Sequence, residues 1–427
     1  MAPRQLTLLF PIIGIIIAGT LNVQAQQSSS PASGSALVRA AQSFNPDMSV
    51  IVDMYYHTDD SEEGISHILE EMSGFGHVHS DEEHHHHGVE DGFNLRHLEL
   101  QLSATADPYF KGSAIAAVSE EGAELETAEM ETTFLPHGLK LRGGKFYSDF
   151  GYINAQHSHQ WDFTDQPLIY KLCLGDHGLN DKGVQLSWLA PTPFYLIAGV
   201  EAFQGENETM FAYDGEAPLP SHDGPRLGVA WLKGSPNLPG NHALQMGIFG
   251  ASGKHQEAHD GDGDGAEDHW LDGDNTFWGA DFVYKYNAPS AYGQGDVVFQ
   301  GEYFNRRKAL DVVAHDLAPD LVGNSRTDDQ DGYYVQAVYG FLPRWRAGLR
   351  WEQVGLTNDS DLPDGTSETY GSSYRTGAML DFTPSEFSRL RLQVNQGAYE
   401  TPDGKEDVTE VYVQWMLSLG AHAAHKF

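Results

Sequence analysis

Residues 344–353 read RWRAGLRWEQ, and apolar and charged side chains alternate along this stretch. One face of the extended chain would carry apolar side chains, namely Trp345, Ala347, Leu349 and Trp351. The opposite face would carry Arg346, Gly348, Arg350 and Glu352. Successive side chains of a β-strand point to opposite faces, so the alternation predicts a strand between an apolar and a polar environment.

The same alternation recurs at 95–106, 138–144, 387–394 and 411–419. Turn residues separate many such segments, and the pattern predicts an all-β chain of about sixteen strands. The candidate strands are 48–57, 93–106, 109–119, 123–134, 139–147, 182–190, 194–204, 225–234, 241–251, 275–287, 295–305, 331–341, 345–356, 371–382, 387–397 and 408–420.

The connections between these strands alternate in length. Every second connection is short and contains proline, as in ADP, LPHG, APTP and FLPR. Most of the others are long, polar and acidic: 58–92, 148–181, 205–224, 252–274, 306–330, 357–370 and 398–407. Short turns on one rim and long loops on the other are typical of bacterial outer-membrane barrels. We therefore predict a transmembrane antiparallel β-barrel over 47–427, with short periplasmic turns and long acidic, His-rich extracellular loops.

Charge indicates which face of the strands is the inner one. The polar faces carry ionic side chains, and a membrane barrel turns its apolar face to lipid while its interior is polar. We expect eight of these ionic residues to line the lumen: Lys140, Arg142, Arg346, Arg350, Arg389, Arg391, Glu99 and Glu352.

The N-terminal segment is typical of an exported protein. Arg4 precedes an apolar stretch at 6–21, and VQA at 23–25 is a small-residue cleavage site. The stretch is shorter than the roughly 18 to 20 residues of a membrane-spanning helix. We therefore expect a signal peptide at 1–25 and, because 26–46 is rich in Ser, Ala and Gln, a flexible leader after it.

Composition excludes several classes of protein and site. The formal net charge of -36 argues against nucleic acid as a partner. The single cysteine, Cys173, excludes an internal disulfide and any zinc site built from several cysteines. The sequence has no G-x-S-x-G, H-E-x-x-H or P-loop motif, so we do not expect an enzyme.

The most conspicuous motif is GHVHSDEEHHHHGVED at 76–91. Neutral imidazole binds Zn²⁺ and similar ions, and nearby carboxylates add ligands and negative charge. The candidate ligands are His77, His79, Asp81, Glu82, Glu83, His84, His85, His86 and His87. The alternatives are a hydrophilic loop that binds no metal and a pH sensor.

Other predicted loops add further metal candidates. His157 and His159 lie in the connection 148–181, where they could line a constriction or pack beside Trp161. The remaining candidates are His255, His259 and His269. The acidic segment 260–268 begins like an EF-hand loop but has Leu271 where a bidentate Glu is required, so we expect at most a loose Ca²⁺ site there.

Several stretches resemble a family of porin-like proteobacterial outer-membrane proteins. They include NPDMSVIVDMYY, GFNLRHLELQLSATADPYFKGSAIAAV and the tail MLSLGAHAAHKF. GLKLRGGKFYSDFGYIN also resembles a segment of phosphate-selective-type porins, although the His-rich first loop departs from those porins. The resemblance implies a sixteen-stranded, channel-like barrel without catalytic residues. It also implies that the partners are outer-membrane lipid, lipopolysaccharide and the barrel-assembly machinery. Association into a homotrimer is left open.

These observations predict a channel for small solutes in the outer membrane of a Gram-negative cell. Its His-rich external loops would concentrate divalent cations such as Zn²⁺, and its lumenal charges would select polar solutes. The alternative is a non-conducting metal-binding or adhesin-like barrel. A TonB-dependent receptor is disfavoured, because the chain has no room for its plug domain.

Overall fold

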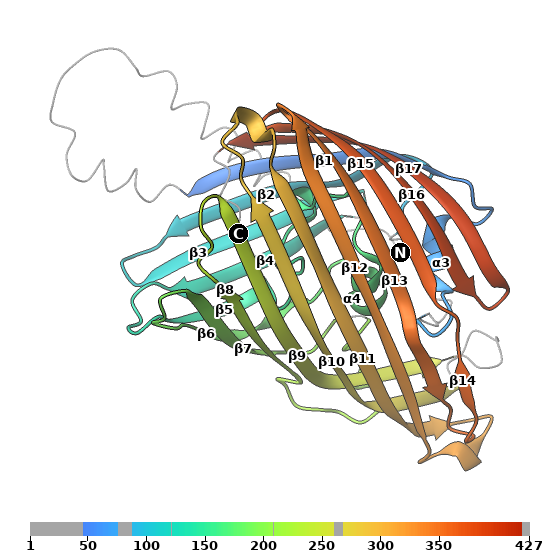
Figure 1. Ribbon diagram of the computed structural model, residues 1–427. Coiled ribbons are helices and arrows are strands. Elements are labelled where there is room, and N and C mark those ends of the chain that lie inside the picture. Colours follow the sequence, from blue (N-terminus) through green and yellow to red (C-terminus); the bar gives the residue numbers. More distant parts are fainter. Residues whose placement is uncertain (1–45, 76–87, 121, 208, 260–267, 421–427) are drawn as a thin grey trace, which may run out of the picture. The chain divides into compact units, whose positions relative to one another are not determined.

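The computed structural model describes residues 46–75, 88–120, 122–207, 209–259 and 268–420. These residues form one antiparallel sheet of 17 strands (Figure 1). The strands are β1 (Asp47–Asp59), β2 (Gly92–Thr105), β3 (Phe110–Val118), β4 (Ala123–Thr132), β5 (Leu139–Tyr147), β6 (Asn180–Leu189), β7 (Tyr195–Phe203), β8 (Leu227–Ser235), β9 (His242–His259), β10 (His269–Tyr286), β11 (Val297–His315), β12 (Ser325–Leu342), β13 (Trp345–Asp361), β14 (Ser367–Thr369), β15 (Ser373–Ser385), β16 (Ser388–Thr401) and β17 (Gly404–Gly420).

The sheet closes on itself. Each long strand pairs with its neighbours in the sequence, and β1 pairs with both β2 and β17, so that Ile51 lies opposite Glu99 and Ser418. The three-residue β14 pairs with β13 only, and the other sixteen strands form the ring. A closed barrel leaves no unpaired strand edge, as a bilayer requires. The predicted fold is therefore confirmed.

The two faces of the strands differ as the alternation predicts. In β13, Leu349 is 64% exposed, whereas Arg350 and Glu352 are 2% and 0% exposed. Leu186, Ile248 and Leu417 are likewise exposed on other strands. A continuous apolar exterior of this kind needs hydrocarbon around it, and barrels of this architecture belong to the outer membrane of Gram-negative bacteria. None of the described helices is long and apolar enough to cross a bilayer.

Several strands continue far into regions that the sequence predicted to be loops. The predicted loops 252–274 and 306–330 are largely strand, and 398–407 contains only a two-residue turn between β16 and β17. His255, His259 and His269 therefore lie on strands and not on loops. Beyond the bilayer the outer face of a strand meets water in place of lipid, so the apolar alternation disappears while strand pairing continues. Cross-strand ion pairs such as Arg307–Asp329 (3.4 Å) support these extensions.

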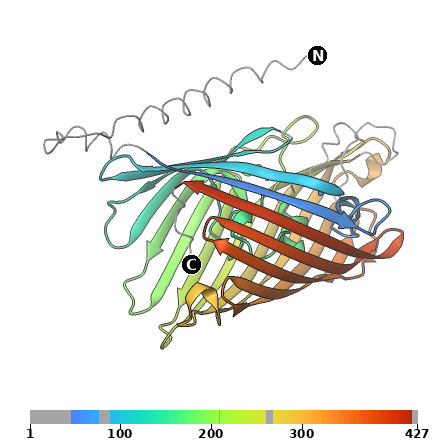
Figure 2. The ribbon, with the colours of Figure 1, turned by 90° about the horizontal axis from the view of Figure 1, so that it is seen from above.

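The connection between β5 and β6, residues 148–179, folds into the barrel, and we call it the inner loop. It contains η1 (Ser158–Gln160) and α4 (Leu168–Leu174), which Figure 2 shows within the ring of strands. The other short helices lie in other connections: α3 (Ile65–Glu70), η2 (Ala291–Gly293) and η3 (Pro319–Leu321). All residues of α4 except Lys171 are buried.

The interior is less polar than the sequence predicted. Phe150 of the inner loop packs against Phe249, Phe277 and Phe304 of the barrel wall, with ring centroids 5.0, 5.1 and 5.9 Å away. These rings belong to one buried apolar cluster that includes the side chains of α4. On β9 to β11 the inner face thus carries aromatic as well as polar residues, and its aromatic residues pack against the inner loop.

The segments 1–45 and 76–87 lie outside the described residues. The predicted signal peptide and nearly all of the leader fall in the first, and His77, His79, Asp81, Glu82, Glu83 and His84 to His87 fall in the second. Of the predicted Ca²⁺ segment 260–268, residues 260–267 also lie outside the described residues, and only Asp268 is described.

Candidate functional site

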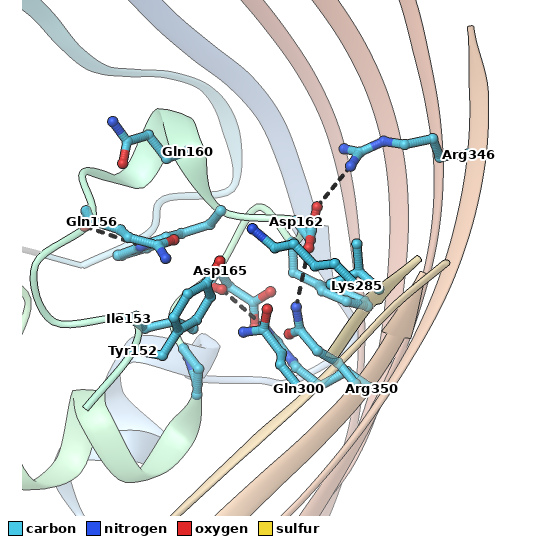
Figure 3. A pocket seen from close by; sticks show the side chains of 15 residues that line it. Tyr152, Ile153, Gln156, Gln160, Asp162, Asp165, Lys285, Gln300, Arg346 and Arg350 are labelled. Atoms are coloured by element: carbon cyan, nitrogen blue, oxygen red, sulfur yellow. Dashed lines mark hydrogen bonds and ion pairs between the residues drawn. The ribbon is translucent and has the colours of Figure 1, made fainter. Parts of the chain in front are cut away.

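Two aspartates fix the inner loop to arginines of the barrel wall. Asp162 Oδ1 lies 2.9 Å from Arg346 Nη1, and Asp165 Oδ2 lies 2.5 Å from Arg350 Nη2 (Figure 3). Arg375 of β15 also reaches Asp165, with Nη2 at 2.8 Å. The side chains of Arg350 and Arg375 are 1% and 3% exposed, so Asp165 sits in a buried ion-pair network.

The residues around Asp165 keep its carboxyl group ionised. Burial acts to raise the pKa of this carboxyl, but the guanidiniums of Arg350 and Arg375 outweigh it and lower the pKa to about 2. A carboxyl whose pKa falls on folding stabilises the fold above its unfolded pKa of about 3.9, and the contribution is lost as the pH falls through about 2. The anchor is therefore intact at every physiological pH.

Glu352 extends the same network to the start of α4. Its carboxylate lies 2.7 Å from Arg350 Nε and 2.9 Å from Arg375 Nε, and it accepts a 2.6 Å hydrogen bond from the backbone N–H of Leu168. Arg350 and Glu352 are thus paired side by side on β13. Their charges are compensated locally and by the inner loop.

A second carboxylate, Glu302 of β11, holds the other part of the inner loop. It accepts hydrogen bonds from the backbone N–H groups of Tyr152 (2.9 Å) and Ile153 (3.0 Å). The hydroxyls of Tyr170 and Tyr334 donate to it at 2.8 and 2.6 Å. All four donors converge on one buried side chain, so Glu302 fixes the inner loop and α4 together.

Replacing Tyr170 with phenylalanine tests this anchor. The change keeps the ring but removes one donor to a buried carboxylate, so we expect the free energy of unfolding to fall by about 1–3 kcal/mol. Denaturant unfolding in detergent, followed by tryptophan fluorescence, measures the loss. Tyr292→Phe is the matched control, because Tyr292 is 66% exposed and its change is expected to have no effect. Equal stability of both variants would contradict the anchor.

The remaining predicted wall arginines also bind the inner loop. Arg389 Nη1 donates to the carbonyls of His159 and Trp161, both at 3.2 Å. Arg391 Nη2 donates to the carbonyl of Trp161 at 2.9 Å, and its Nε lies 2.9 Å from Asp381. Asp381 is 0% exposed and also pairs with Arg346.

Lys140, Arg142 and Glu99 lie on other strands. Lys140 of β5 forms a partly exposed pair with Glu131 at 3.0 Å. Arg142 is buried and binds Glu129 (3.4 Å) and Asp149 of the inner loop (3.0 Å). Glu99 of β2 is buried beside His157 and His159 of the inner loop and does not belong to the arginine network.

Two cavities adjoin the inner loop. The smaller has a volume of about 200 Å³, and its charged lining residues are Asp162, Asp165, Lys285, Arg346 and Arg350. The larger has a volume of about 630 Å³ and extends between the inner loop, α3 and the strands β2 to β4. Ile153, Gln156, Trp161 and Asp165 line both cavities, so the inner loop forms the wall between them. Figure 3 shows Asp162 and Asp165 directed toward the arginines of β13.

The described metal candidates fall into two groups. His157 and His159 stack in the inner loop, with ring centroids 5.7 Å apart, and His159 Nδ1 lies 3.1 Å from Glu99. His255, His259 and His269 gather at the ends of β9 and β10, joined by Glu257, which contacts both His255 (2.9 Å) and His259 (3.0 Å).

Sequence patterns did not single out several residues of these networks. They are Asp162, Asp165, Glu302, Arg375 and Asp381. For Arg375 and Asp381 a signal was available, because both lie in β15 on the face opposite the exposed Leu380. For Asp162 and Asp165 there was none, since a loop without periodicity does not show which wall it contacts.

Comparison with known proteins defines the relatives of this chain. No protein-family model matches it. A protein of Aquifex aeolicus, described only as uncharacterized, is 37% identical over 398 residues, which is 90% of this chain and 81% of that protein.

Solved structures of outer-membrane proteins share the fold. OmpT of Vibrio cholerae, solved in a trimer form, has a TM-score of 0.54 at 12% identity, covering 88% of this chain and 99% of that one. OprB of Pseudomonas putida has a TM-score of 0.53 at 10% identity, and the match covers 90% of this chain and 96% of that one. The channel DcaP of Acinetobacter baumannii has a TM-score of 0.51 at 13% identity, and the match covers 88% of this chain and 96% of that one. The chain therefore has the fold of outer-membrane β-barrels, and it belongs to the same family as the Aquifex aeolicus protein.

Proposed function

We propose that the barrel is an outer-membrane channel for small polar or charged solutes, with the inner loop as its constriction. The observation that carries the proposal is the pair of cavities on the two sides of the inner loop, which share Trp161 and Asp165 as wall residues. Charged groups fixed at a narrow point favour solutes that can exchange water for ionic contacts. Lys285 and Arg346 beside Asp162 offer both signs of charge there.

A specific observation favours a second candidate. The aromatic cluster around Phe150 and α4 fills part of the interior, which supports a barrel that does not conduct. Such a protein would act at the surface, as a metal-binding or adhesin-like barrel.

Single-channel recording in planar bilayers separates the two candidates. For a channel, we expect discrete conductance steps from the purified protein, because its inner loop would constrict the lumen without sealing it. The control is the same detergent preparation after heat denaturation. A correctly folded barrel that gives no steps would overturn the channel and favour the second candidate.

We also propose that the His-rich segment 76–91 concentrates divalent metal ions at the mouth of the barrel. The support is its composition, since imidazole and carboxylate together suit Zn²⁺. We expect Zn²⁺ to alter the conductance of the parent but not that of a variant lacking residues 77–87. An identical response of both proteins to Zn²⁺ would contradict this part of the proposal.

Association into homotrimers is part of the same proposal, and the trimer form of the Vibrio cholerae protein supports it. Chemical cross-linking in detergent tests it, with a trimer band as the expected result.

A further inference from the structure

Five ionisable side chains meet where the inner loop contacts β2 and β4. His157 and His159 come from the inner loop, His97 and Glu99 from β2, and Glu126 from β4. Glu99 Oε2 lies 3.1 Å from His159 Nδ1, 3.7 Å from His97 Nε2 and 3.8 Å from His157 Nδ1. His157 Nδ1 is also 3.2 Å from Glu126 Oε1. Donor atoms of Glu99, Glu126 and His157 all lie within 4.8 Å of one another.

A β-bulge places Glu126 in this cluster. In the pairing of β3 with β4, Ile115 lies opposite Thr127 and Ala116 opposite Leu125, which leaves Glu126 as the extra residue. A second bulge in β2 skips Arg96, between the pairs Asp53–His97 and Met54–Leu95. Bulges re-aim side chains and are frequent next to functional sites. Two strands that are separated only by β3 thus break their regular pairing at the level of the cluster.

The cluster has unused coordinating capacity. Glu99 Oε1 and Glu126 Oε2 are buried oxygen atoms with no hydrogen-bond partner among the described residues. Within those residues, the ion-pair contacts of both carboxylates are made by histidines only, whereas Asp165 and Asp381 have arginines. Burying a carboxylate without a compensating cation is costly. Two such oxygens in one place therefore point to a missing cation.

We propose that Glu99, Glu126 and His157 bind a divalent transition-metal ion of the Zn²⁺ type, with His97 and His159 beside them. One imidazole nitrogen and two carboxylates suit Zn²⁺ and its first-row neighbours, whereas Ca²⁺ and Mg²⁺ prefer oxygen ligands alone. Ligands at 2.0–2.2 Å in tetrahedral arrangement are about 3.4 Å apart. The separations of 3.2 and 3.8 Å from His157 Nδ1 to Glu126 and Glu99 are close to that value.

The neighbouring groups can orient the ligands. The hydroxyl of Tyr147 donates to Glu126 Oε1 at 2.5 Å, and the Tyr147 and His157 rings meet edge-on with centroids 5.3 Å apart. Such outer contacts fix ligand geometry in metal sites. Glu126 and His157 line the larger cavity, which gives a cation a route to the site.

The inference deepens the proposed channel function by naming a class of cation, and it rests on that function only for delivery of the ion. Metal binding by the purified barrel does not require conduction. The test uses the full chain in detergent with His77, His79 and His84 to His87 changed to alanine, so that the histidines of the His-rich segment 76–91 contribute no metal binding. Isothermal titration with Zn²⁺ and the visible absorption of Co²⁺ are the readouts.

We expect one equivalent of Zn²⁺ per chain in this background. Glu126→Gln combined with His157→Ala should lower the affinity by at least about 100-fold, and His159→Ala alone by about 10–100-fold, because His159 positions Glu99. The matched control is Glu63→Gln with His67→Ala, which changes two of the three residues in the exposed trio Glu63, His67 and Glu71 and should leave binding unchanged. Circular dichroism and the heat-dependent gel mobility of each variant verify that the barrel is folded.

Several outcomes would overturn the site: no binding in the parent background, equal affinity in the Glu126 and His157 variant, or loss of binding in the control. Absence of binding in the parent background would mean that protonated imidazoles alone compensate the two carboxylates. Conductance measured on the same preparations separates this failure from failure of the channel. Conduction without metal binding removes only the site, and metal binding without conduction removes only the channel.

Discussion

Replacing Asp165 with alanine is expected to lower the free energy of unfolding of the barrel by about 3–5 kcal/mol, because buried charges are left without their partner. Arg350 and Arg375 would keep Glu352 but lose the carboxylate that joins them to the inner loop. Gln393 and Asn395 also donate to Asp165, and each would lose one of its acceptors. Denaturant unfolding in detergent, followed by tryptophan fluorescence, measures the change.

The same substitution should increase the conductance. Without Asp165 the inner loop loses its ion pairs with Arg350 and Arg375, one of its connections to β13 and β15. The segment around Trp161 should then leave the narrow point more often. We expect larger or noisier single-channel steps than in the parent. Asp162→Ala is the matched control for stability, because Arg346 is 26% exposed and retains Asp381 as a partner. If both variants were equally stable, Asp165 would not be the main anchor.

Placing arginine at Leu349 should prevent stable insertion of the barrel. Leu349 faces outward in β13, is 64% exposed and lies opposite Ala337 and Ala378 of the adjoining strands. A lipid-facing arginine near the middle of the bilayer costs about 2–4 kcal/mol. The measurement is the folded fraction after refolding into lipid vesicles, read from heat-dependent gel mobility.

The control for this change is Val322→Arg, in the connection between β11 and β12. Val322 is 47% exposed but lies outside the membrane-spanning part of the strands, so the expected effect is within about 0.5 kcal/mol. Equal folding of both variants would show that the face of Leu349 does not meet lipid.

Those parts of the fold that depend on local chemistry could be predicted from the sequence. Contact with lipid imposes the period-2 alternation, so Leu349 and Arg350 could be assigned to opposite faces without knowledge of their neighbours. The segregation of connection lengths predicted the antiparallel ring. The extended strands β9 to β12 could not be predicted, because charges occur on both faces of them beyond the bilayer.

The candidate site depends on contacts between distant parts of the chain. Asp165 and Arg350 are 185 residues apart, and no local pattern shows that they meet. Glu126 faces the cluster through a bulge, which simple alternation cannot reveal. The stacked His157 and His159 were recognised as candidates because their motif is local. Of their carboxylate partners, Glu99 was expected only to line the lumen, and Glu126 was not recognised.

The pairing of β1 with β17 has a consequence for biogenesis. Ser49 lies opposite Gly420, so the last hydrogen-bonded seam joins residues from the two extremes of the ring. Contacts this distant in the chain form slowly, because loop closure must precede them. The ring cannot be completed before β17 has been exported, and until then its first strand carries an unsatisfied edge. An unclosed sheet of this kind is prone to join other chains, so it needs a chaperone or a templating surface until the last strand arrives.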